Sequence, residues 1–162
     1  MKPIGGFFEL EVPQLGRSPH PRALALSTGR ACLMVMLDVL KPEVVHLPFH
    51  TCDATLEPFH RVGVPYRFYS LKEDLSPSTL PRLSQGEYFL WTNYYGVCDI
   101  FTERLKSKYG NQLLIDDTHA FFRDGHEGYW SFTSARKYFG VPDGAYLYAP
   151  VALDIDAPRF TG

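Results

Sequence analysis

The chain has 162 residues, a formal net charge of −2, and 45% hydrophobic and 15% aromatic residues. This length suits one domain with its own core, and this composition is typical of a globular rather than a disordered chain. Because the sequence has no long basic or acidic run and no apolar run long enough to span a bilayer, we expect neither nucleic acid nor membrane as a partner.

The N-terminus, MKPIGGFFELEVPQ, contains acidic residues and lacks an apolar signal core, so we expect no export signal and a cytoplasmic protein. The cysteines are Cys32, Cys52 and Cys98. Their odd number and wide spacing are typical of free thiols in a reducing compartment. No CxxC pair is present, so we expect no cysteine-based metal site.

Residues 1–24 are rich in proline and glycine and predict an irregular arm, followed by one domain over 25–162. The first element of that domain is a helix that Ser27 or Thr28 can cap. Its residues 31–40 are apolar on nearly all sides, which predicts a buried helix. The elements expected next are a strand at 43–47, a helix at 51–63 distorted by Pro58 and ended by Gly63, strands at 65–71 and 87–93, a helix at 99–110, and strands at 112–117, 128–134 and 144–150.

Strands that alternate with helices predict an α/β fold, with a mostly parallel sheet between helices on both faces. Ligands of such sheets bind at the carboxyl ends of the strands. The positions that this rule selects are the turn at 27–31, the segment at 93–96, the acids Asp116 and Asp117, and the turn at 134–137. We expect them to meet along one rim.

The stretch STGRA opens a helix, whose free N–H groups and dipole attract an anion such as phosphate. It also fits an ordinary helix cap, and no Walker motif is present. In LLIDDTHAF, a carboxylate after a buried strand can hold a protonated ring nitrogen, or it can cap a turn. His119 fits either the same pocket or a structural role.

The stretch SARK places Ser134 three residues before Lys137. An amine in a desolvated pocket beside another cation, here Arg136, loses its proton more readily and can attack a carbonyl. Ser134 could bind a phosphate. Lys137 also fits a plain surface lysine, and the S-x-x-K spacing of serine acyl-transfer enzymes lacks its companion S-D-N and K-T-G motifs here.

Taken together, these signals suit pyridoxal phosphate, which needs an anion site, a carboxylate and a lysine. The chain resembles the fold-type I enzymes that use this cofactor, and among them the DegT/StrS-type sugar aminotransferases of polysaccharide and antibiotic-sugar pathways. The resemblance extends over most of the chain. It rests on LSTGRACL for the phosphate turn, HLPFHTCDAT for the joint with the ring-stacking residue, IDDTHAF for the Asp-x-x-His motif, and SARKYFGVPDGAYLY for the lysine turn.

The resemblance implies that Lys137 forms a Schiff base with pyridoxal 5'-phosphate and that Asp116, three residues before His119, contacts the pyridinium nitrogen. His119 would lie near the phenolic oxygen of the ring. The phosphate would be bound by backbone groups of Gly29, Arg30 and Ala31 and by the Ser134 hydroxyl. The implied reaction is a transamination in which an amino donor passes its nitrogen to a keto-sugar.

The sequence departs from this family at several points. Cys52 occupies the position of the ring-stacking aromatic, and Phe49 or His50 could stack instead. Arg30 replaces a small hydroxyl residue and could add a cation. Family members are longer and carry a C-terminal small domain, so we expect this chain to be an incomplete large domain. The family also implies a homodimer. The other interpretations are a non-catalytic relative that binds cofactor or oligomerises, and an α/β nucleotide-binding module.

Overall fold

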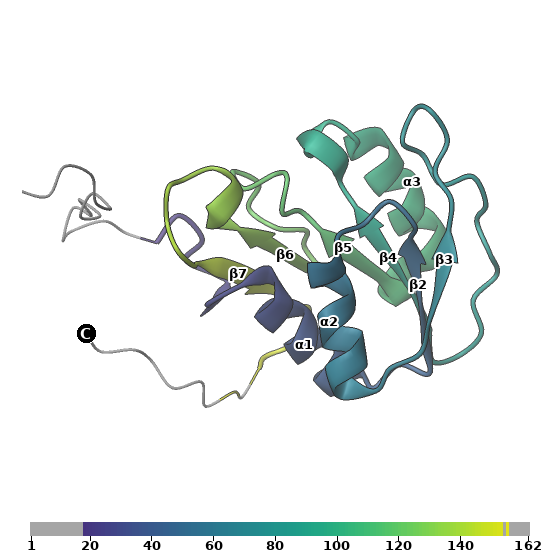
Figure 1. Ribbon diagram of the computed structural model, residues 1–162, viewed down its shortest axis with the longest axis horizontal. Helices are drawn as coiled ribbons and strands as arrows, with labels where there is room; N and C mark the ends of the chain where they lie inside the picture. Colours follow the sequence, from purple (N-terminus) through teal and green to yellow (C-terminus); the bar gives the residue numbers. More distant parts are fainter. Residues whose placement is uncertain (1–17, 154, 156–162) are drawn as a thin grey trace, which may run out of the picture.

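The computed structural model describes residues 18–153 and residue 155. Most of the expected arm, residues 1–17, lies outside the described residues, as does the end of the expected domain after residue 155. The strands are β1 (Leu24–Leu26), β2 (Val44–Pro48), β3 (Tyr66–Tyr69), β4 (Glu87–Thr92), β5 (Leu113–Asp116), β6 (Trp130–Ser134) and β7 (Ala145–Tyr148). They form a single seven-stranded sheet in the order β1-β7-β6-β5-β4-β2-β3 (Figure 1).

Five consecutive strands of this sheet run parallel to one another: β6, β5, β4, β2 and the edge strand β3. Strands β7 and β1 are added antiparallel at one edge. The expected α/β fold with a mostly parallel sheet is confirmed. Strand β1 was not expected, and it includes Leu24, which the sequence analysis assigned to the arm.

The helices are α1 (Gly29–Leu40), α2 (Asp53–Val62) and α3 (Asp99–Tyr109). Helices α1 and α2 lie on one face of the sheet and α3 lies on the other, so the three layers are confirmed (Figure 1). Thr28 caps α1 by accepting a hydrogen bond from the Ala31 N–H at 3.1 Å. Helix α2 ends at Gly63 as expected, with Pro58 inside it. Among the residues described, no helix is both long enough and apolar enough to cross a bilayer.

Helix α1 is less buried than its apolar composition predicts. Its buried residues are Cys32, Leu33, Met36 and Leu37, which pack on the sheet and on α2. Val39 points away from this contact and remains 44% exposed. The prediction of a helix buried on all sides is therefore wrong, because in the described chain no further layer covers its outer face.

Alternation along the strands decides which residues reach which face. Leu90, Leu114 and Phe132 belong to the core beneath α1 and α2, whereas Phe89, Trp91 and Ile115 belong to the core beneath α3. Two residues further along, Thr92, Asp116 and Ser134 continue the first set at the carboxyl ends of β4, β5 and β6. Side chains from three strands are thereby directed to the same end of the α1/α2 face.

Candidate functional site

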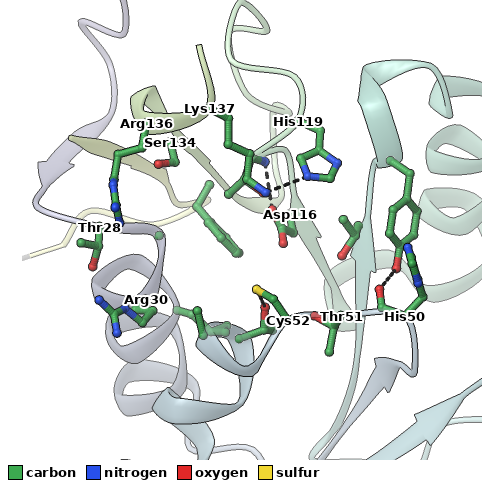
Figure 2. Close-up of a pocket in the computed structure, with 18 of the residues that line it drawn as sticks. Thr28, Arg30, His50, Thr51, Cys52, Asp116, His119, Ser134, Arg136 and Lys137 are labelled. Atoms are coloured by element: carbon green, nitrogen blue, oxygen red, sulfur yellow. Dashed lines mark hydrogen bonds between the residues drawn. The ribbon is translucent and has the colours of Figure 1, made fainter. Parts of the chain in front are cut away.

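A cavity of about 390 Å³ lies at the carboxyl ends of β4, β5 and β6, next to the N-termini of α1 and α2 (Figure 2). Of the residues expected at a site, Gly29, Arg30, Asp116, His119, Ser134 and Lys137 line it. Ala31 does not line it, and its N–H is donated to the Thr28 hydroxyl. The structure therefore brings together most of the scattered positions that the sequence analysis selected.

Asp116 is a buried acid at this cavity, with only 7% of its surface exposed. Its Oδ1 accepts a hydrogen bond from the Thr118 N–H at 2.9 Å. Within residues 18–153, no lysine, arginine or histidine lies at ion-pair distance from it. Burial raises the pKa of this carboxyl group, and the bonds to Thr118 only partly oppose that rise. A buried carboxylate of this kind is suited to a cationic ligand group.

Asp117 has a different role, because strand alternation turns it to the opposite face. Its Oδ1 accepts a hydrogen bond from Asn93 Nδ2 at 3.1 Å, and its Oδ2 lies 2.8 Å from His126 Nε2. Both side chains of the Asp117–His126 pair are almost fully buried. Both carboxylate oxygens of Asp117 therefore have partners in a buried network, and of the two acids only Asp116 lines the cavity.

Lys137 and His119 meet at the same end of the cavity as Asp116 (Figure 2). Lys137 Nζ lies 2.7 Å from His119 Nε2, and His119 Nδ1 accepts a hydrogen bond from the Tyr95 N–H at 3.2 Å. Burial, then the charges of Lys137 and His50, lower the pKa of His119 and favour a neutral ring. Which nitrogen of a neutral ring carries the proton sets whether Nε2 donates or accepts in the contact with Lys137.

Tyr95 lies in the segment at 93–96 that was expected at the rim, but its individual role was missed. It adopts a φ of +55°, which is uncommon for a bulky residue, and its ring stacks on His119 at 5.7 Å. Phe132, also missed, lines the cavity from the middle of the sheet. The sequence could have indicated this, because Phe132 lies two residues before Ser134 and residues at this spacing face the same side of a strand.

The two arginines near the cavity lie differently from what the sequence suggested. The guanidinium group of Arg30 is paired with Glu57 of α2. Arg136 extends toward Thr28 at the start of α1 and away from Lys137 (Figure 2). The expectation that Arg136 lies beside the Lys137 amine is therefore wrong, because consecutive residues of the turn point in different directions.

Of the three candidates for ring stacking, Cys52, His50 and Phe49, only two line the cavity. Cys52 and His50 line the cavity, and the Cys52 thiol points into it (Figure 2). Phe49 does not line it; it is 70% exposed and packs against Phe68 with ring centroids 5.4 Å apart. Phe49 is thus excluded as a wall of this cavity, whereas Cys52 and His50 remain.

The residues present fit pyridoxal phosphate. The N–H groups of Gly29 and Arg30 lie in the first turn of α1, where a helix has no acceptor for them and attracts anions. Lys137 supplies an amine and Asp116 a buried carboxylate without a counter-ion within the described chain. The cavity volume also lies within the usual range for small-ligand sites, roughly 300–1,000 Å³.

No protein-family model matches the sequence, and no curated protein matches it. Solved structures do share its fold. DesV of S. venezuelae, solved with a ketimine intermediate, is 20% identical with a TM-score of 0.60 over 80% of this chain. A putative aminotransferase of Burkholderia pseudomallei is 18% identical with a TM-score of 0.59 over 77% of it, and the sugar aminotransferase CalS13 of Micromonospora echinospora is 16% identical with a TM-score of 0.56 over 82%.

This chain spans 40% of the length of DesV, 44% of the Burkholderia protein and 42% of CalS13. Each comparison covers at least 77% of this chain. The described part of the chain therefore has the mostly parallel α/β fold seen in these aminotransferases.

Proposed function

We propose that this chain is a pyridoxal-phosphate-dependent aminotransferase that moves an amino group from a small-molecule donor to a keto-sugar. The observation that carries the proposal is the convergence of Lys137, Asp116 and the start of α1 on one cavity. These three features come from distant parts of the sequence. They supply the amine, the carboxylate and the anion site that this cofactor requires.

When bound, pyridoxal phosphate supplies an aldehyde that condenses with amines and a protonated ring that absorbs the electron pair of a carbanion. The Asp116 carboxylate would hold the proton at the ring nitrogen. Lys137 Nζ would bind the aldehyde carbon and, once displaced by an amino donor, would move the donor's α-proton. His119, which contacts Nζ at 2.7 Å, would orient that amine.

The keto-sugar acceptor is supported by the fold shared with the sugar aminotransferase CalS13, at 16% identity. A nucleotide-linked sugar used in polysaccharide biosynthesis is the acceptor that we propose. We also propose that residues 25–162 form the cofactor-binding large domain of a cytoplasmic homodimer, which is the arrangement that the DegT/StrS resemblance implies.

The proposal is tested by adding pyridoxal phosphate to the purified chain. We expect a visible absorption band that survives dialysis and is missing in Lys137→Ala. An amino donor should then convert this band to that of the aminated cofactor. A stable band that no donor converts would instead identify a non-catalytic cofactor-binding protein. Absence of any band that depends on Lys137 would refute the proposal and favour a nucleotide-binding module.

A further inference from the structure

Arg136 and Lys137 occupy one tight turn, the 3₁₀ helix Ala135–Lys137 that follows β6. Consecutive residues of a 3₁₀ helix point about 120° apart. Lys137 extends to His119, whereas Arg136 extends toward Thr28 at the start of α1 (Figure 2). Both residues line the cavity, so this single turn places an amine at one end of it and a guanidinium group at the other.

Arg136 has no acidic partner among the residues that the structure describes. Other arginines do: Arg22 pairs with Asp124, Arg123 with Asp99, and Arg30 with Glu57. Glu57 also lies 3.2 Å from Arg61 Nε, so it is shared between two arginines of its own neighbourhood. The side chain of Arg30 is thereby directed to α2, and Arg136 is left as the unpaired guanidinium group at the cavity.

The end of the cavity that Arg136 faces already favours negative charge. The first turn of α1 contributes the N–H groups of Gly29 and Arg30 and the positive end of the helix dipole. The Ser134 hydroxyl adjoins it, and its only hydrogen bond within the described chain is a long one, 3.4 Å, to the Gly144 carbonyl oxygen. Arg136 is exposed, so water screens its repulsion from the helix start, and an anion bound between the two would be attracted by both.

We propose that Arg136 binds the phosphate group of the cofactor, together with the start of α1 and Ser134. The inference rests on the proposed function and extends it to a residue that the DegT/StrS resemblance did not assign. The planar fork of a guanidinium group matches two phosphate oxygens, and α1 would contact the phosphate from the opposite side. Arg30 contributes its backbone N–H group, while its side chain stays with Glu57.

The first test compares pyridoxal phosphate with pyridoxal, which has the same aldehyde and ring but no phosphate. Each would be titrated into the intact chain, with the Lys137-dependent visible band as the readout. We expect Arg136→Met to weaken the binding of pyridoxal phosphate by about tenfold to a hundredfold, as is typical for the loss of a charged hydrogen bond. Binding of pyridoxal should stay unchanged. Arg136→Lys, which keeps the charge but loses the fork, should be intermediate.

Arg104→Met serves as the matched control, because Arg104 is an exposed arginine of α3 on the opposite face of the sheet. It loses the same charge far from the cavity and should leave both titrations unchanged. Inorganic phosphate gives a second readout without the cofactor: it should raise the unfolding temperature of the wild-type chain more than that of Arg136→Met.

The outcomes separate this inference from the proposed function. If both compounds form the Lys137-dependent band and Arg136→Met weakens them equally, or weakens neither, the assignment of Arg136 is wrong and the cofactor proposal stands. If neither compound forms the band in the wild-type chain, both fail. A selective loss for the phosphorylated compound, absent in Arg104→Met, supports the inference.

Discussion

Lys137 Nζ and His119 Nε2 lie 2.7 Å apart at the cavity, within hydrogen-bonding distance. The Tyr95 N–H donates a hydrogen bond to the other ring nitrogen of His119, Nδ1, at 3.2 Å. This contact joins the turn after β4, the loop after β5 and the turn after β6, which are far apart in sequence. It is also the point where the proposed chemistry depends on protonation.

The His119–Lys137 contact makes a prediction about pH. The pKa of His119 is lowered by burial and by the positive charge of Lys137, so the ring should stay neutral until the pH falls below its ordinary pKa. In Lys137→Met the charge is gone and the pKa of His119 should rise, although burial keeps it below the ordinary value. NMR titration of the ring protons measures this. Lys106→Met, in an ion pair with Glu103, is the control; an unchanged His119 titration in Lys137→Met would contradict the assignment.

Asp116 is expected to lower the stability of the cofactor-free protein. Burial raises its pKa above the ordinary value, so the folded state favours the protonated acid and loses stability as the pH rises through that pKa. Asp116→Asn removes the buried charge and should raise the free energy of unfolding at neutral pH by about 1–2 kcal/mol. Urea denaturation at neutral and acidic pH tests this, and the gain should shrink on acidification. The same variant should lose the cofactor's electron-sink chemistry.

Asp117→Asn is the matched substitution, and it should act in the opposite direction on stability. Asp117 accepts a bond from Asn93 and lies against His126. An asparagine keeps an oxygen for Asn93 but turns an N–H group to His126 Nε2, so His126 must move its ring proton to Nδ1 or lose the contact. A buried polar group left unpaired in this way costs about 1–3 kcal/mol. A double-mutant cycle with His126→Gln should show coupling between the two positions. We expect a much smaller effect on the cofactor than for Asp116→Asn; equal effects would mean that the wrong acid has been assigned.

Gly96 is expected to be essential for the placement of His119. It has a φ of +68°, and a Cβ atom there would lie 2.7 Å from the His119 carbonyl oxygen. Gly63 has a φ of +78° with no atom within 4 Å of such a Cβ, so it tests the backbone strain alone. Gly63→Ala should cost about 1–2 kcal/mol of unfolding free energy. Gly96→Ala should cost more and should also shift the NMR signals of His119, which Gly63→Ala should leave in place.

Cys52 should be the thiol that reacts with an alkylating reagent in the native protein. It is exposed and lines the cavity, whereas Cys32 and Cys98 are buried, and burial raises the pKa of both of those thiols. Mass spectrometry after treatment with iodoacetamide should find modification at Cys52, and none in Cys52→Ser. Bound pyridoxal phosphate should slow the reaction. Equal rates with and without the cofactor would place the cofactor elsewhere.

Much of the fold could be predicted because its signals are local. The cap at Thr28 and the end of α2 at Gly63 follow from side-chain hydrogen bonding and from backbone freedom, and both are confirmed. Strand β1 escaped prediction, since its pairing with β7 joins segments more than a hundred residues apart, as in the register of Leu24 with Leu147. The exposure of Val39 could not be predicted either, because it depends on which elements pack over α1 in the folded chain.

For the candidate site, the sequence by itself determined the chemical inventory: a lysine turn, a strand-end acid and a helix start, ordered so that parallel strands would bring them to one edge. The Asp-x-x-His resemblance already favoured Asp116 over Asp117. The tertiary structure supplied the physical reason, because it places Asp116 at the cavity and bonds Asp117 to Asn93 and His126. It also separated Arg136 from Lys137 and paired Arg30 with Glu57. The physical reason is that residue types follow from the chain, whereas direction and ion-pair partner depend on how distant segments pack.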